Sequence, residues 1–161
     1  MKKIKLVLLS AIFIFTSATY ATTLPGYYVG TQFLGGTYNG NTNYAQALFV
    51  GYQYNCYWAL EGAVLTDFSS TKANSYQIYS VLAKAMLPFG TGFDIFAKAG
   101  LGYVTPGNVA NIVAPIVGAG VSYDITSQLV VDATYNHLNN TATVNDINYY
   151  GIGLSYHFCA L

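Results

Sequence analysis

Four charged residues interrupt otherwise apolar stretches of the chain, and they are the first candidates for chemistry. Two are acids, Glu61 and Asp132, and two are lysines, Lys84 and Lys98. Charged groups that are withdrawn from water have to be paired. Two acids and two lysines can neutralise one another without any further ion, so they predict an internal polar cluster, with Asp94 as a further candidate member.

The remaining reactive side chains are few. Cys56 and Cys159 are the two cysteines, and a bond between them would close a loop of about 100 residues and stabilise the fold by about 4–5 kcal/mol. A disulfide needs Cα atoms within about 7 Å of each other, so two separate thiols remain the alternative. No cluster of metal-ligating residues surrounds His157, and neither a metal nor a cofactor is predicted.

The first 21 residues predict a secretory signal peptide. A basic start with three lysines is followed by an apolar run over residues 6–15 and by the small residues Thr19 and Ala21. The apolar run is too short to anchor the chain across a bilayer. We therefore expect residues 1–21 to be removed and residues 22–161 to form one domain, with a formal charge of 3 − 6 = −3.

The rest of the chain alternates apolar residues with small or polar ones, and turn residues interrupt it at regular intervals. A period of two predicts β-strands. Charged residues make up 7% and aromatic residues 16%, which is too apolar for a surface that faces water. The eight expected strands are Gly26–Tyr38, Tyr44–Tyr54, Trp58–Phe68, Ser75–Pro88, Phe93–Val104, Ile112–Asp124, Gln128–Leu138 and Ile147–Phe158.

Two kinds of connection alternate along the chain. The tight turns are the stretch Asn55–Tyr57, "FGTG" and "DITS", whereas the longer polar connections read "NGNTN", "SSTKAN", "TPGNVAN" and "NNTATVND". Short turns at one end and longer loops at the other are typical of up-and-down barrels in outer membranes, whose short turns face the periplasm. An even number of strands then places both termini on the periplasmic side.

The two faces of each strand differ in bulk, and this difference predicts which face meets lipid. In the last strand one face carries large apolar residues, whereas the other is rich in glycine and serine. Small residues suit the lumen of a narrow barrel, and tyrosines near strand ends suit the membrane interfaces. We therefore predict an all-β fold, an eight-stranded antiparallel up-and-down transmembrane β-barrel, with a small secreted lipocalin-like barrel as the alternative.

Several stretches resemble the small outer-membrane barrels of the OmpA-like and opacity-like group. They are "GYYVG" (Gly26–Gly30), "GYQYNCYWALEG" (Gly51–Gly62), "GAGVSYDIT" (Gly118–Thr126) and "GIGLSYHF" (Gly151–Phe158), and the resemblance extends over the whole mature chain. It implies a location in the outer membrane of a Gram-negative bacterium. It also implies that the alternating apolar residues of the last strand form the C-terminal signature that the assembly machinery recognises. These residues are Tyr150, Ile152, Leu154, Tyr156 and Phe158, and "CAL" after Phe158 departs from the usual terminal phenylalanine.

The resemblance gives the charged cluster two interpretations. Glu61 lies in "ALEG", where the family places an interior glutamate. The cluster of Glu61, Asp132, Lys84 and Lys98 is then either a static polar plug or the gate of a weakly conducting pore. The second interpretation follows from the resemblance to the best-known family member, in which switching between such ion pairs implies a gated conductance. An eight-stranded barrel has no open channel by its width alone.

His137 raises a remote enzymatic alternative. Some barrels of this size are similar in shape and modify lipid A, with a His-x-Ser pair near the outer rim and an acid on the next strand. Here Asn139 occupies the serine position and Asp146 follows. An amide cannot serve as the nucleophile, so we predict that the protein is not an enzyme and that His137 is an interfacial residue.

We therefore expect a structural surface protein, with adhesin-like contacts through short extracellular loops in which Lys72 is the single base. The expected partners are outer-membrane lipids, lipopolysaccharide and the assembly machinery, and the expected state is a monomer. The chain contains no arginine, which argues against nucleic-acid binding. The sequence specifies no host partner or ligand.

Overall fold

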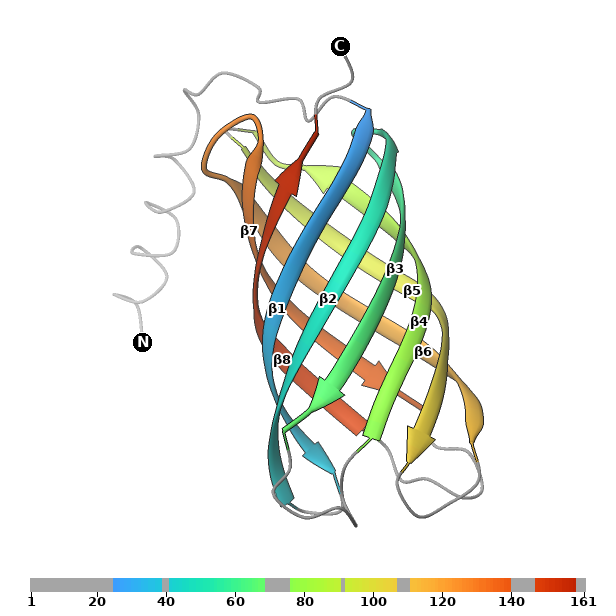
Figure 1. Ribbon diagram of the computed structural model, residues 1–161. Coiled ribbons are helices and arrows are strands. Elements are labelled where there is room, and N and C mark those ends of the chain that lie inside the picture. The colour runs from blue at the N-terminus through green and yellow to red at the C-terminus, as the bar shows by residue number, and fades with distance from the viewer. Residues whose placement is uncertain are drawn as a thin grey trace, which may run out of the picture.

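The chain forms a single closed β-barrel in the computed structural model, which describes residues 25–38, 41–68, 76–90, 92–106, 111–139 and 147–158. Each strand pairs antiparallel with its neighbour in sequence, and β1 pairs with β8 to close the wall (Figure 1). The strands are β1 (Gly26–Tyr38), β2 (Asn41–Asn55), β3 (Trp58–Asp67), β4 (Tyr76–Pro88), β5 (Phe93–Pro106), β6 (Ile112–Asp124), β7 (Leu129–Leu138) and β8 (Ile147–His157). The predicted fold class is confirmed.

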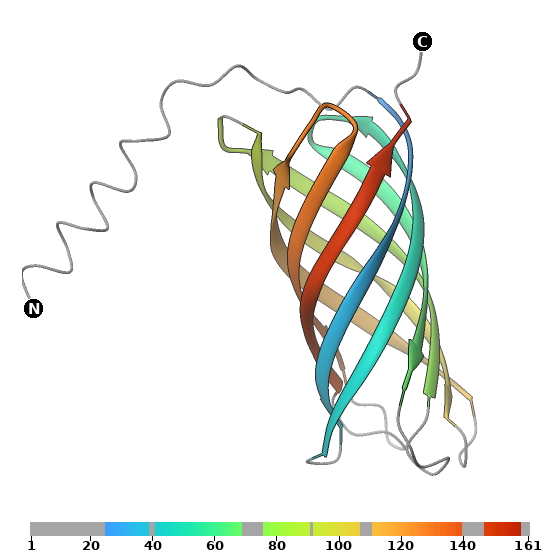
Figure 2. The ribbon, with the colours of Figure 1, turned by 60° about the vertical axis from the view of Figure 1, so that its left-hand side comes forward.

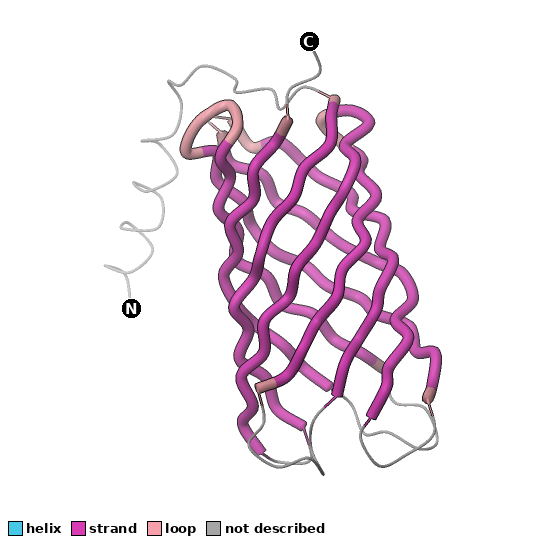
Figure 3. The backbone as a smooth tube through the Cα atoms, in the orientation of Figure 1, coloured by secondary structure: helices cyan, strands magenta, loops and turns pink. Residues whose placement is uncertain are grey.

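Strands make up nearly all of the described backbone, as the tube in Figure 3 shows. None of the described residues lies in a helix that is long and apolar enough to cross a membrane. A closed ladder gives every strand two hydrogen-bonded neighbours, so no edge is left unpaired. The strands are tilted relative to the barrel axis, as Figure 2 shows. Closure of an eight-stranded sheet requires such a tilt.

The tight turns lie at one end of the barrel, which is the upper end in Figure 1. In the β2–β3 turn the Asn55 side chain accepts hydrogen bonds from the backbone N–H groups of Tyr57 and Trp58, at 2.8 and 2.9 Å. In the β4–β5 turn Gly90 and Gly92 have φ angles of 68° and 79°, which glycine adopts without strain. These local features explain why the chain reverses at these points.

One boundary prediction was wrong. The segment "NGNTN" was expected to be a longer loop, but β2 begins at Asn41 and its pairing with β1 continues to Tyr38 opposite Asn41. Two residues therefore join these strands. Their sequence, Asn-Gly, is the one preferred in two-residue hairpins, and this signal could have located the turn. The other strand ends coincide with the prediction or differ from it by at most two residues.

The outer wall carries the large apolar side chains, as predicted. On β8 the exposed side chains include Tyr150, Ile152, Leu154 and Tyr156, whereas Tyr149, Gly153 and Ser155 are buried. Ten positions separate the exposed Tyr44 from Tyr54 on β2. At about 3.3 Å per residue and a tilt of about 40°, this distance corresponds to roughly 25 Å along the membrane normal. The aromatic residues near the strand ends thus match the height of a bilayer's apolar layer.

Candidate functional site: the filled lumen

The half of the lumen nearer the long connections is filled by aliphatic and aromatic side chains. They come from all eight strands and form one buried cluster: Leu34, Ala45, Ala47, Leu65, Tyr76, Ile78, Leu82, Val104, Ala114, Ile116, Leu138, Ile147 and Tyr149. This cluster was not predicted from the sequence, because the alternation indicated glycine and serine in the interior and bulky residues on the wall. At this level the lumen is therefore occupied by apolar side chains rather than by charged ones.

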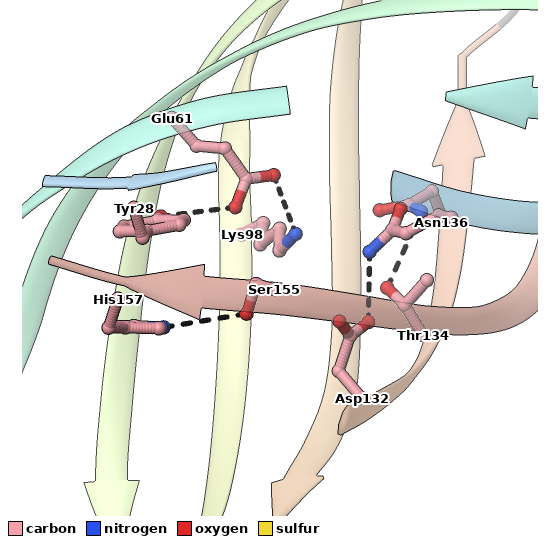
Figure 4. A network of polar contacts seen from close by, with 9 residues as sticks. Tyr28, Glu61, Lys98, Asp132, Thr134, Asn136, Ser155 and His157 are labelled. Atoms are coloured by element: carbon pink, nitrogen blue, oxygen red, sulfur yellow. Dashed lines mark hydrogen bonds and ion pairs between the residues drawn. The ribbon is translucent and has the colours of Figure 1, made fainter. Parts of the chain in front are cut away.

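The predicted charged residues lie in the other half of the lumen, toward the tight turns. Glu61 on β3 and Lys98 on β5 form an ion pair, with Nζ 2.7 Å from Oε1, and both side chains are 3% exposed. The Tyr28 hydroxyl donates a hydrogen bond of 3.2 Å to the second carboxylate oxygen of Glu61 (Figure 4). Burial and the two hydrogen bonds make this pair the best-defined polar contact of the interior.

Lys84 faces the same part of the lumen from β4, directly opposite Lys98 on β5. Its Nζ lies 4.4 Å from the centre of the Phe96 ring and 6.0 Å from that of Tyr28. Within the described ranges, Lys98–Glu61 is the single ion pair closer than 4.0 Å. Lys84 is therefore held mainly against aromatic faces, which attract a cation.

Asp132 is hydrogen-bonded by Gln32 rather than paired with a lysine. The Gln32 side-chain amide donates to the Asp132 carboxylate at 2.8 Å. Gly153 of β8 stands between them in the ladder, opposite Asp132 on one side and Gln32 on the other. A Cβ atom at Gly153 would collide with the side chains of both Asp132 and Gln32, so the glycine leaves the space in which these two side chains form their hydrogen bond. The expected two-by-two pairing of acids and lysines is thus replaced by one ion pair, one amide–carboxylate bond and one lysine over aromatic rings.

Interior glycines make room for the aromatic side chains beside this charged layer. A Cβ atom at Gly51 would collide with the ring of Tyr28, which lies opposite it across the β1–β2 ladder. Gly120 stands in the same relation to Phe96 across the β5–β6 ladder. The glycine-rich inner face predicted from the sequence thus accommodates large neighbours rather than leaving open space.

His157 lies on the side of this layer that is nearer the tight turns. Its ring stacks on Tyr28 with centroids 4.8 Å apart, and Nε2 lies 3.4 Å from the Ser155 hydroxyl (Figure 4). Asp94 is partly buried at the same end of β5. No group of three or more histidine, cysteine or acidic side chains within the described residues is arranged to hold a metal.

His137 lies outside the lumen, near the end of β7 that faces the long connections. Its Nδ1 is 2.7 Å from the Asn148 side-chain oxygen and its Nε2 is 2.9 Å from that of Asn139. Asn139, which the sequence places where a serine nucleophile would stand, thus does contact the ring. Asp146, the proposed acid, lies outside the described residues, as do Lys72, Cys159 and the signal segment 1–21. Cys56 is partly buried in the β2–β3 turn, and its disulfide with Cys159 stays a prediction.

A closed antiparallel barrel with an apolar wall, aromatic bands at both ends and a filled polar-and-apolar interior defines an integral β-barrel protein of outer membranes. The sequence agrees, because residues 6–158 match the family described as "Outer membrane protein beta-barrel domain". The chain belongs to this family of outer-membrane β-barrel proteins.

Solved structures of the same architecture support this assignment at the level of the fold. The N-terminal barrel domain of OprF from Pseudomonas aeruginosa has a TM-score of 0.63 at 16% identity, covering 82% of this chain and 99% of that one. Ail, the attachment invasion locus protein of Yersinia pestis, has a TM-score of 0.57 at 17% identity, covering 83% and 97%. Neisserial surface protein A has a TM-score of 0.57 at 18% identity, with the same coverage.

A relative by sequence is an uncharacterized protein of Coxiella burnetii (strain RSA 493 / Nine Mile phase I). It is 26% identical in the aligned region, and the match covers 68% of this chain and 66% of that protein. The match therefore spans less than two thirds of the relative's length.

Proposed function

We propose that this protein is a structural barrel of the outer membrane whose lumen does not conduct and whose exposed end makes surface contacts. The packed aliphatic cluster across the lumen carries this proposal. Water and ions would have to displace side chains such as Leu138, Ile147 and Ala114, each at most 1% exposed. Opening such a packed layer creates unfilled volume, and creating that volume costs free energy.

Planar-bilayer recordings of the refolded protein test the closed lumen. We expect no discrete openings from the wild-type chain. The positive control is a variant that combines Leu138→Ala with Ile147→Ala. It removes bulk from the cluster, so its recordings should show openings. Regular openings from the wild type would contradict the closed barrel.

The surface role is proposed for the connections between strands at the end opposite the tight turns. They are polar in sequence and lie outside the described residues, and adhesin-like contact through them is supported by the resemblance in fold to Ail, which is named as an attachment protein. Cells that display the full chain should bind a host surface more than cells whose residues 69–75 and 140–146 are replaced by glycine and serine. Equal binding at equal display would remove this role and leave the structural one.

A weakly conducting pore is the second candidate. The observation that favours it is the position of Lys84 directly opposite Lys98, because two lysines then compete for one carboxylate, that of Glu61. If the pair switches, Glu61→Ala should change the frequency of openings in bilayer recordings. Silence of both the wild type and Glu61→Ala would eliminate this candidate without affecting the structural one.

A further inference from the structure

Two acidic side chains face the lumen at the end of the barrel with the tight turns. Asp94 follows the β4–β5 turn, and Asp124 is the last residue of β6. Ser122 is directly opposite Asp94 in the β5–β6 ladder, and Asp124 lies two positions further along the same face, so the two acids are diagonal neighbours within about 7–8 Å. The backbone N–H of Asp124 donates to the Gly92 carbonyl oxygen at 2.8 Å, which holds Asp124 against the turn that precedes Asp94. We call Asp94 and Asp124 the mouth pair.

The Asp124 carboxylate has less compensation than its burial requires. The residue is 8% exposed, and its Oδ1 atom is inaccessible to solvent and has no hydrogen-bond partner among the described residues. A buried carboxylate oxygen that meets neither a donor nor a cation is costly. Oδ1 is therefore an acceptor that the described side chains leave unused.

The inner face of this half of the lumen has an excess of negative charge. Of the described lysines, Lys84 is the one whose charge acts on both Asp94 and Asp124. Its Nζ, however, lies 4.4 Å from the centre of the Phe96 ring and is not within 4.0 Å of any described carboxylate. The inward-facing charges here sum formally to 2 − 4 = −2, from Lys84, Lys98, Glu61, Asp94, Asp124 and Asp132.

We infer that the mouth pair binds a hard divalent cation such as Ca²⁺, with the carboxylates of Asp94 and Asp124 as its protein ligands. Carboxylate oxygens are the ligands that such cations prefer, and water completes the coordination where the protein supplies few of them. Because two acids form this site, it needs no group of three histidine, cysteine or acidic side chains, and none exists among the described residues. The inference rests on the strand register and not on the proposed surface contacts.

A nuclear magnetic resonance titration of the refolded full chain with CaCl2 tests this inference, in a zwitterionic detergent without lipopolysaccharide. We expect the backbone amide signals of Gly92, Asp94 and Asp124 to shift in a saturable way, with a dissociation constant of about 0.1–1 mM, as in weak extracellular calcium sites. Asp94→Asn and Asp124→Asn should each weaken binding about tenfold or more, because each removes one of two charged ligands. Asp94 is partly exposed, so its replacement should leave a folded barrel even if that of Asp124 does not.

The matched control is Asp67→Asn. Asp67 is also a buried acid, but it is the last residue of β3, at the end of the barrel with the long connections. This variant should bind Ca²⁺ like the wild type, and heat-modifiable migration on gels confirms that each variant is folded. The absence of saturable shifts in the wild type up to about 10 mM Ca²⁺ would overturn the inference. Unchanged affinity in Asp94→Asn would overturn it too, as would equal shifts with NaCl at the same ionic strength, which would reveal a non-specific salt effect.

Discussion

At the residue scale, the interior is organised by a buried ion pair and by glycines that fit aromatic rings. Glu61 and Lys98 are both nearly inaccessible to solvent, and Tyr28 supplies one additional hydrogen bond. A buried pair of this kind contributes little net stability as a whole. Loss of one partner is costly, because the other charge then stays buried without compensation.

Replacing Glu61 by Gln should therefore destabilise the barrel by about 3–5 kcal/mol, because Lys98 loses its counter-charge. Urea unfolding in lipid vesicles, followed by the gel mobility of the folded form, measures this change. The double variant Glu61→Gln/Lys98→Met should recover most of the loss, since neither charge of the pair remains and Lys84 still lies against the Phe96 ring. An unchanged unfolding midpoint for Glu61→Gln would show that the pair is exposed to water.

Gly51→Val should prevent folding, because its Cβ would collide with the side chain of Tyr28, to which the three nearest atoms all belong. Removing the ring in Gly51→Val/Tyr28→Ala should restore a folded barrel in the same gel assay. Gly62→Val is the matched control, since the atom nearest to its Cβ, the backbone oxygen of Ser80, is 3.9 Å away. If Gly51→Val folds like the wild type, the Tyr28 ring does not lie against Gly51.

At the scale of strands, alternation in the sequence was sufficient to predict the barrel but not its interior packing. The period of two identified eight strands and their outer faces, because lipid requires large apolar residues at every second position. It did not identify the inner aliphatic cluster, because neighbours such as Ile116 and Val117 are both apolar. Their residue types do not show that Ile116 faces the lumen whereas Val117 faces outward. The partner of Asp132 was missed for a similar reason: Gln32 is 100 residues away in sequence, and only closure of β1 onto β8 brings them together.

The C-terminal signature leads to a prediction at the level of β8. Phe158 follows the strand, is exposed, and has its N–H bonded to the Tyr27 carbonyl oxygen at 2.8 Å. Phe158→Ala should lower the amount of folded barrel in the outer membrane of living cells but leave refolding in vesicles nearly unchanged, because the aromatic ring is proposed to be a recognition signal. Tyr103→Ala, another exposed aromatic on the wall, is the control. Equal losses in cells and in vesicles would indicate a structural role instead.

At the scale of the whole molecule, the barrel resolves two physical demands at once. Closure pairs the backbone groups of every strand, which hydrocarbon requires, and the outer wall offers apolar side chains to the lipid. The interior of such a narrow barrel has to be filled. Here it is filled by an aliphatic layer toward the long connections and by a charged and aromatic layer toward the tight turns.

The central claim is that the exposed apolar face of each strand contacts lipid while the other face is enclosed, and adjacent tyrosines on β8 test it. Tyr149 is 3% exposed and Tyr150 is 56% exposed, so each can be replaced by tryptophan at nearly the same depth, in a Trp58→Phe background without other tryptophans. Quenching by bromine-labelled lipids should be strong for Tyr150→Trp and weak for Tyr149→Trp. Equal quenching, or stronger quenching at position 149, would contradict the account.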